Sequence, residues 1–231
     1  GLVGSEMCIR DSYYVEFMKK HIFAYLNPPI TSKVLPMYWY LGYNVYSKGV
    51  LEVGGVILAS WIVPIHENYD GLDYWCTCMF GEDNPSDPYL IPTDRALLDR
   101  RRKMILAPVL EKAVKAGNII IPEEFEVGFD HVTNLIAGLG MEDDPNYYLT
   151  RGYPGSVNTY VFNSISEPAN NSYPPTNEET FIGYMHLSMY YNQARLAEVY
   201  PADKYPFLTE KFAFVQKYFC LLYTSDAADE L

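Results

Sequence analysis

Cysteine is scarce in this sequence, and its few cysteines do not form a framework of spaced pairs. The chain has 4 cysteines in 231 residues, and only Cys76 and Cys78 lie away from its two ends. A fold held by disulfides needs several spaced pairs, and a zinc site built on this pair needs two further ligands. We therefore expect two ordinary thiols here and no metal site.

Positive charge is also scarce. The chain has 17 lysines and arginines against 29 aspartates and glutamates, which gives a formal net charge of −12. An acidic chain is repelled by phosphate backbones, so we expect no nucleic-acid partner. The sequence also lacks the composition of a disordered chain, because 49% of its residues are hydrophobic and 22 are tyrosines.

Catalytic and nucleotide-binding motifs are missing as well. The sequence has no HExxH metal motif, no GxSxG elbow and no glycine pattern that would cradle a phosphate. We therefore expect no cofactor. The first functional hypothesis is a non-catalytic interaction or assembly protein, such as an accessory subunit or scaffold with a protein partner. An enzymatic role stays open, and the sequence indicates no compartment.

The two ends of the chain resemble translated sequencing adapter. Residues 7–12 back-translate to the mosaic end of transposase-based library preparation, and residues 220–225 back-translate to its reverse complement. Two adapter arms in opposite orientations are hard to obtain by chance at two ends of one chain. We therefore expect residues 1–12 and 220–231 to be non-native, and residues 13–219 to be an internal fragment to which fold reasoning applies.

The residues between these ends predict a mainly α fold, with helices joined by long loops rich in proline and tyrosine; an α+β fold is the alternative. A minor strand pair is expected near residues 50–63. The predicted parts are a helical region over 13–140, a long loop over 141–176 and a helical pair over 177–219. A loop of that length is typically functional or mobile.

Individual helices follow from hydrophobic spacing and from residues that start or stop helices. Apolar residues at helical spacing predict a first helix that Pro28-Pro29 ends, and Pro108 predicts a kink or break within the second. Thr176 is the predicted cap of the fourth helix. The predicted ranges are Tyr14 to Leu26, Thr93 or Asp94 to about Ala116, about Glu123 to Ala137, about Asn177 to Val199, and about Ala202 to Phe219.

The segment 49–65 is nearly all apolar and has two interpretations. The first is a buried strand pair, Val50–Val53 and Val56–Val63, that turns at the Gly-Gly pair between the strands. The second is a membrane-spanning helix, which needs roughly 20 apolar residues and is typically flanked by aromatic side chains. The second interpretation would make the protein a single-pass membrane-anchored subunit, with membrane contact through 49–65.

Four residues are candidates for catalysis. Glu126, Asp130 and His131 fall on the predicted helix over 123–137, where an i,i+4 spacing would place both carboxylates on one face. Two carboxylates and an imidazole can share a proton or hold a metal ion, but the spacing matches no metal motif. His186 falls on an apolar helix face, where it is either a hydrogen-bonded core histidine or an acid or base in a polar pocket.

Three residues of the predicted long loop are candidates for binding. Arg151, Tyr153 and Tyr160 lie in a stretch that is both aromatic and polar, around a Gly-Tyr-Pro-Gly turn. Tyrosine gives contact area and a hydroxyl at low entropic cost, which suits protein interfaces and the stacking of sugars. A carbohydrate-binding protein or a carbohydrate-active enzyme that uses this loop is therefore an alternative function. The rings would otherwise only fix the loop to the domain.

Overall fold

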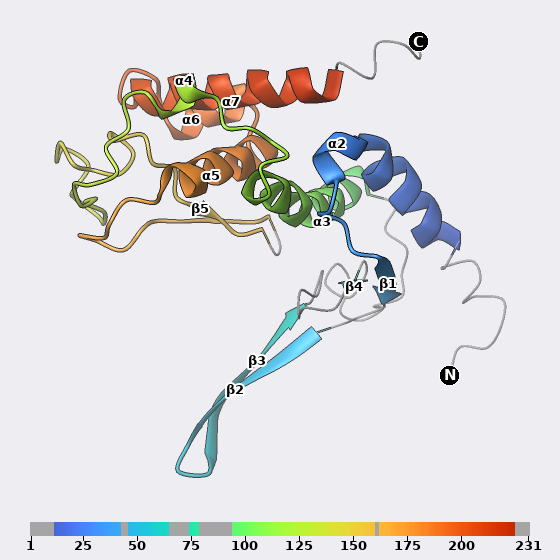
Figure 1. Cartoon of the computed structure of the whole chain (residues 1–231). Helices are drawn as coiled ribbons and strands as arrows, with labels where there is room; N and C mark the ends of the chain where they lie inside the picture. Colours follow the sequence, from blue (N-terminus) through green and yellow to red (C-terminus); the bar gives the residue numbers. More distant parts are fainter. Residues whose placement is uncertain (1–11, 43–45, 65–73, 79–93, 160–161, 225–231) are drawn as a thin grey trace. The chain divides into compact units, whose positions relative to one another are not determined.

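The computed structural model describes residues 12–42, 46–64, 74–78, 94–159 and 162–224 (Figure 1). About 46% of the described residues are helical, and the described strands form three two-stranded sheets, so the fold is mixed and α-rich. The chain forms two compact units, Gly1–Leu110 and Glu111–Leu231.

The first unit begins with helical turns, as predicted for Tyr14 to Leu26. Residues 12–17 are α-helical and continue into η1 (Met18–Ile22) and η2 (Phe23–Tyr25). Met18 and Ile22 are buried there. Pro28 and Pro29 then open the short helix α2 (Pro28–Thr31), because a proline is tolerated in the first turn of a helix, where its missing N–H has no partner.

A parallel strand pair that the sequence did not predict follows α2. Strand β1 (Tyr38–Gly42) pairs with β4 (Tyr74–Cys78). The rings of Trp39 and Trp75, which are register partners, meet edge to face with centroids 5.1 Å apart, and Trp75 is buried. This aromatic contact explains why the tyrosine- and tryptophan-rich stretch is a strand, since paired rings stabilise neighbouring strands.

The segment between β1 and β4 contains the predicted strand pair. Strands β2 (Tyr46–Val53) and β3 (Val56–Pro64) are antiparallel and form a hairpin (Figure 1). The turn at Gly54 and Gly55 has φ values of 60° and 80°. A two-residue turn of this kind requires positive φ at both positions, which glycine adopts without strain. The strand pair near 50–63 is therefore confirmed.

The predicted burial of this pair is wrong. Apolar side chains on both strands are exposed to solvent, including Val53, Ile57 and Leu58, which are 58%, 62% and 62% exposed. A buried strand and an uncovered strand can have the same apolar sequence pattern. They differ only in their tertiary contacts, which the sequence pattern does not show. The structure also gives strands where the membrane interpretation of 49–65 needs a helix. Among the described residues, no helix has the length and apolar character needed to cross a membrane.

Helix α3 (Arg95–Lys115) matches its prediction at both ends. Its first turn is capped by Asp94, whose Oδ1 accepts hydrogen bonds from the backbone N–H groups of Ala96 at 2.7 Å and Leu97 at 3.2 Å. Gly117, at φ 74°, follows its end. The helix continues across Pro108, so the predicted break at this proline is wrong.

In the second unit, the predicted helix over 123–137 is wrong beyond its first turn. Helix α4 spans only Glu123–Glu126. Gly128 then takes φ 94°, which is outside the helical region. Asp130 Oδ1 accepts the backbone N–H groups of Val132 at 2.8 Å and Thr133 at 3.1 Å, so this aspartate organises a turn in place of a helix. Glu126 and Asp130 therefore do not share a helix face.

The predicted helical pair at the end of the chain is three helices. They are α5 (Asn177–Tyr190), α6 (Gln193–Val199) and α7 (Pro206–Thr224). Thr176 caps α5 as predicted, and together with Glu179 it forms a capping box. The predicted continuation to Val199 fails at Tyr191, whose backbone is extended, and Asn192 caps α6 by accepting the N–H of Arg195 at 2.8 Å.

Aromatic rings form the core of the second unit. Phe125 on α4 has no exposed surface and meets Phe181 and Tyr184 of α5 edge to face, at centroid distances of 5.0 and 5.6 Å. The hydroxyl of Tyr184 donates to the backbone carbonyl of Gly152 at 2.6 Å, which ties α5 to the preceding segment. Such a buried bond is costly to lose because the carbonyl would stay unsatisfied.

Two short strands lie in the segment that precedes α5. Strand β5 (Ser156–Val157) pairs with β6 (Ile165–Ser166) in an antiparallel ladder. A Cβ on Gly155 would stand 2.3 Å from the backbone oxygen of Ser166, so the ladder depends on a glycine at this position.

Candidate functional site

The second unit brings four of the predicted site residues into one hydrogen-bonded cluster. The Arg151 guanidinium lies 3.1 Å from the Asp130 carboxylate and donates to the Asp130 backbone oxygen at 2.6 Å. The Tyr153 hydroxyl donates to the same backbone oxygen at 2.8 Å and lies 3.3 Å from His131 Nδ1. Residues separated by about twenty positions in the sequence therefore meet around one turn.

The electrostatics of this cluster stabilise charged Asp130 and neutral Tyr153. Hydrogen bonds from the N–H of Val132 and from Thr133 lower the pKa of Asp130 to about 2, and the charge of Arg151 adds to them. Burial raises the pKa of Tyr153 to about 12. Near neutral pH, Asp130 is therefore a hydrogen-bond acceptor that is difficult to protonate, and Tyr153 is a donor that is difficult to ionise.

His131 is held inside the cluster. Its Nδ1 lies 2.6 Å from the backbone oxygen of Pro175, so this nitrogen carries the proton and donates it, since a carbonyl only accepts. Its Nε2 is buried and has no hydrogen-bond partner within the described part of the chain. Nδ1 is therefore occupied by the Pro175 carbonyl, and Nε2 is shielded from solvent. Neither nitrogen is well placed to exchange a proton with a substrate.

The remaining predicted residues lie outside this cluster. Glu126 accepts a hydrogen bond from the side-chain amide of Asn177, which joins α4 to the first residue of α5. Tyr160 lies outside the described residues. Across the ranges that the structure describes, no group of three histidine, cysteine, aspartate or glutamate side chains is placed to hold a metal ion. The cluster thus positions a loop, with Arg151 and Asp130 as its main polar contact.

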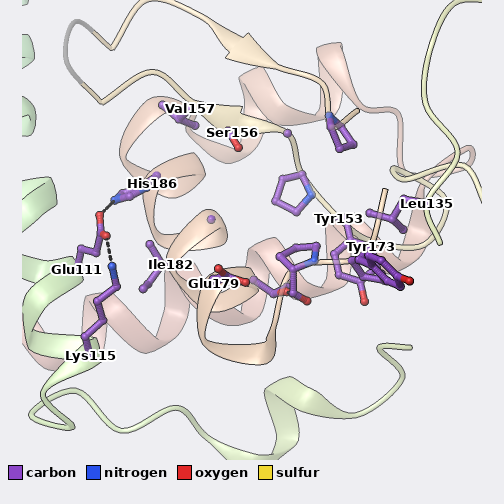
Figure 2. A pocket seen from close by; sticks show the side chains of 17 residues that line it. Glu111, Lys115, Leu135, Tyr153, Ser156, Val157, Tyr173, Glu179, Ile182 and His186 are labelled. Carbon is purple, nitrogen blue, oxygen red and sulfur yellow. Dashed lines mark hydrogen bonds and ion pairs between the residues drawn. The ribbon is translucent and has the colours of Figure 1, made fainter. Parts of the chain in front are cut away.

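Next to this cluster, the second unit contains a pocket of about 580 Å³ (Figure 2). Tyr153 and Pro175 belong to both. The other lining residues come from the end of α3, from the segment between α4 and β5, from β5, from the loop before α5 and from α5 itself. They are Glu111, Lys115, Leu135, Pro154, Gly155, Ser156, Val157, Pro168, Tyr173, Pro174, Glu179, Thr180, Ile182, Gly183 and His186.

Charged side chains gather at one end of the pocket. Glu111 on α3 accepts a hydrogen bond from Lys115 at 2.6 Å and lies 3.8 Å from Nε2 of His186 on α5 (Figure 2). The hydrogen bond to Glu111 raises the pKa of Lys115. His186 is 8% exposed and lies at a polar pocket wall beside a carboxylate. Its role, as a core histidine or as an acid or base, stays a prediction.

The opposite end of the pocket is aromatic and apolar. Figure 2 shows Tyr153, Tyr173 and Leu135 together there, away from the charged end. Tyr153 and Leu135 are buried, whereas Tyr173 is 82% exposed. Tyr173 therefore presents an open ring at the pocket, and nothing in the sequence pattern distinguished it from the other tyrosines of this segment.

Lys211 on α7 is a polar core residue that sequence reasoning also missed. It is 3% exposed, its ammonium lies 5.2 to 5.9 Å from the ring centroids of Phe125, Phe129 and Phe207, and it donates to the Glu124 backbone oxygen at 3.1 Å. Burial lowers its pKa. Contact with three ring faces stabilises a cation, so Lys211 serves the core between α4 and α7.

Comparison with known proteins gives no relative from which a role could be transferred. No protein-family model, no curated protein and no solved structure matches the chain.

Proposed function

We propose that this protein is a non-catalytic assembly protein, and that it pairs with a second copy of itself through the edge of β3 that no described strand occupies. The observation that carries the proposal is the exposure of the hairpin of β2 and β3. Val56, Leu58 and Trp61 on β3 are 60%, 62% and 50% exposed. Exposed apolar side chains grouped on one strand in this way are typical of an interaction site.

The two edges of the hairpin differ in how they are protected. Strand β2 carries Lys48 and Glu52 and has an irregularity in its pairing at Leu51 and Glu52. Charges and bulges of this kind discourage further pairing. Strand β3 spans Val56–Pro64 with no charged residue and no glycine, and among the described strands it pairs only with β2. Its outer edge is therefore the better template for another strand.

A second copy fits this edge for a geometric reason. When two identical antiparallel edges meet across a two-fold axis, both present the same backbone groups in opposite directions, and a four-stranded sheet results. A two-stranded hairpin alone is only marginally stable in water, whereas three or more strands with an apolar face are stable. Pairing with a second copy thus extends the two-stranded hairpin to four strands, which is enough for a stable sheet.

A protein partner is favoured over a lipid one by the backbone of the hairpin. An open strand edge exposes N–H and C=O groups, and in hydrocarbon each unsatisfied group costs several kcal/mol. Another strand satisfies these groups and covers the apolar side chains at the same time. Membrane contact through 49–65 is for this reason the less favoured interpretation.

The non-catalytic part of the proposal is supported by the cluster around Asp130. Its candidate catalytic groups donate to or accept from backbone atoms of their own unit, and both nitrogens of His131 are engaged or buried. Groups that are used to hold a loop are poorly placed to act on a substrate.

Sedimentation equilibrium of the full chain over a wide range of concentration tests the proposal. We expect the wild type to dimerise, and we expect Leu58→Lys to remain monomeric because a lysine on an edge strand blocks further pairing. Ile57→Lys, one position away on the same strand, is a second such variant. Leu139→Lys is the matched control, since Leu139 is 98% exposed and lies in the second unit.

Two outcomes contradict the proposal. One is a wild-type chain that stays monomeric throughout the concentration range. The other is a dimer whose association constant is the same in Leu58→Lys, Ile57→Lys and Leu139→Lys. Vesicle flotation of the wild type, with Leu58→Lys beside it, adds the lipid arm: flotation that depends on Leu58 without any dimer would assign the hairpin to a membrane surface.

A further inference from the structure

The pocket of the second unit is a separate feature from the hairpin, and its size is the first clue to what it takes. Its volume of about 580 Å³ lies within the usual range of small-ligand sites, roughly 300 to 1,000 Å³. It is also formed by residues far apart in the sequence, from Glu111 to His186. A ligand of one or two rings fits such a space.

The polar wall of the pocket offers both donors and acceptors. Lys115 and Ser156 donate, Glu111 and Glu179 accept, and His186 adds a ring nitrogen beside Glu111. The wall carries charges of both signs, because one lysine lies among two glutamates and is already bonded to one of them. A strongly charged ligand would meet groups of both signs here.

The carboxylate of Glu179 has a fixed position. Its Oε2 accepts hydrogen bonds from the backbone N–H and the hydroxyl of Thr176, at 2.8 and 2.9 Å, in the capping box of α5. These bonds lower its pKa. A carboxylate that the helix start already orients loses little conformational freedom when it accepts a further hydrogen bond from a ligand.

The remaining walls are flat and apolar. The prolines Pro154, Pro168, Pro174 and Pro175 line the pocket together with Tyr153 and the open ring of Tyr173. Rigid rings of this kind contact the flat C–H face of another ring at low entropic cost. Figure 2 places the tyrosines at the end opposite Glu111, so stacking and hydrogen bonding act at different ends of one ligand.

We infer that this pocket binds a neutral sugar of one or two rings, stacked on Tyr173 and hydrogen-bonded toward Glu179, Lys115 and Glu111. Each sugar hydroxyl both donates and accepts, which matches a wall that does both. A sugar ring also has an apolar face and a polar rim, which matches the two ends of the pocket. The inference does not rest on self-pairing of β3, because no residue of β3 lines the pocket.

A proline-rich peptide is the competing ligand. Such peptides dock on aromatic grooves, but they present an apolar, weakly polar surface. They would form few hydrogen bonds with the charged end around Glu111, and a ligand that displaces water from polar groups without replacing its hydrogen bonds loses affinity. The sugar is favoured for that reason, and the peptide becomes one arm of the test.

Isothermal titration calorimetry of the full chain is the first measurement, against a panel of glucose, galactose, N-acetylglucosamine, maltose, cellobiose and chitobiose. A ligand of roughly twenty heavy atoms at ordinary efficiency predicts a dissociation constant between about 10 µM and 1 mM for the best of these sugars. A proline decapeptide is titrated in parallel.

Two substitutions at Gly183 test the place of binding. Gly183 lies on α5 and lines the pocket, and a Cβ there would meet only Pro154 Cγ, at 3.9 Å. Gly183→Leu extends a side chain into the pocket, whereas Gly183→Ala adds a single methyl group in ordinary van der Waals contact with Pro154. Both favour the helix over glycine, so a loss of binding in the leucine variant alone is due to the filled pocket.

Tyr173→Ala tests the stacking surface. We expect about a tenfold weaker dissociation constant, as for the loss of one aromatic stacking contact. Tyr38→Ala is the matched control, because Tyr38 is a well-exposed tyrosine on β1 in the other unit. Its affinity is expected to equal that of the wild type.

Any one of three results would overturn the inference. They are the absence of binding to every sugar of the panel, equal sugar affinity in Gly183→Leu and Gly183→Ala, and binding of the proline decapeptide alone. Because these variants leave β3 untouched, a failure here leaves the dimerisation experiment standing, and the reverse also holds.

Discussion

The hairpin of β2 and β3 and the aromatic core around α5 both contain many apolar side chains, but the core buries them and the hairpin exposes them. Phe125, Phe181 and Tyr184 of the core are fully buried, whereas Val53, Ile57 and Leu58 of the hairpin are more than half exposed. Burying one such side chain stabilises a fold by about 1.5–3 kcal/mol. The core side chains therefore stabilise their own unit, and those of the hairpin are available to a partner.

The largest effect that tests this contrast is expected from Phe125→Ala. Removing a fully buried ring that contacts Phe181 and Tyr184 should lower the free energy of unfolding by about 3–5 kcal/mol. Urea denaturation followed by helical circular dichroism measures it. All three tryptophans, Trp39, Trp61 and Trp75, lie in the first unit, so tryptophan fluorescence reports on that unit separately. An equal shift in both signals would show that the two regions unfold as one.

Gly152→Ala should have the next largest effect. Gly152 has φ 78°, and a Cβ there would stand 2.5 Å from the ring of Phe207. Strain of this kind together with a displaced ring costs about 1–3 kcal/mol. Gly138→Ala is a control for the backbone part alone, because Gly138 has φ 112° but no atom near its Cβ position. Equal losses in the two variants would mean that the contact with Phe207 contributes nothing.

Acid should destabilise the second unit through Asp130. Its pKa is about 2 in the folded protein against an ordinary value of 3.8, so the folded state favours the carboxylate. The stabilisation is present above about pH 4 and is lost as the pH falls toward 2. Denaturation midpoints measured between pH 5 and pH 2 should fall less steeply in Asp130→Asn, which keeps the acceptor oxygen but does not titrate. Parallel slopes would assign the acid loss to other groups.

The smallest effect is expected from Ile57→Thr in the hairpin. Ile57 is 62% exposed, and exposed substitutions usually change the free energy of unfolding by less than about 0.5 kcal/mol. Threonine keeps the β-branched shape that strands favour. A loss comparable to that of Phe125→Ala, measured in the same urea series on monomeric protein, would show that the hairpin is covered in solution and would remove the contrast.

Features with a local cause were predictable from the sequence. The Gly54-Gly55 turn, the Asp94 cap and the Thr176 capping box each depend on a few adjacent residues, and the structure contains all three. The helix predicted over 123–137 failed because its acidic first turn and the glycines after Ala137 were weighed above Gly128 and the turn-forming Asp130. A polar side chain that satisfies its own backbone competes with a helix.

The arrangement of the candidate site was less predictable. Asp130, His131, Arg151 and Tyr153 were each singled out, but their meeting depends on contacts between distant segments. The pocket draws on α3, α5 and the loop before α5, so no single stretch of sequence carries its signature. Exposure of Tyr173 and burial of Lys211 likewise follow from packing, which hydrophobic periodicity does not determine.

Ionisation of the buried tyrosines provides an absorbance signal for the unfolding of the second unit. Burial raises the pKa of Tyr153 and Tyr200 to about 12 and raises that of Tyr184 well above its ordinary value of 10. In alkaline solution the unfolded chain releases these protons before the folded one does, so stability declines as the pH rises past 10. The part of the tyrosinate absorbance that comes from these three rings would then appear when the protein unfolds and would mark unfolding without any added label.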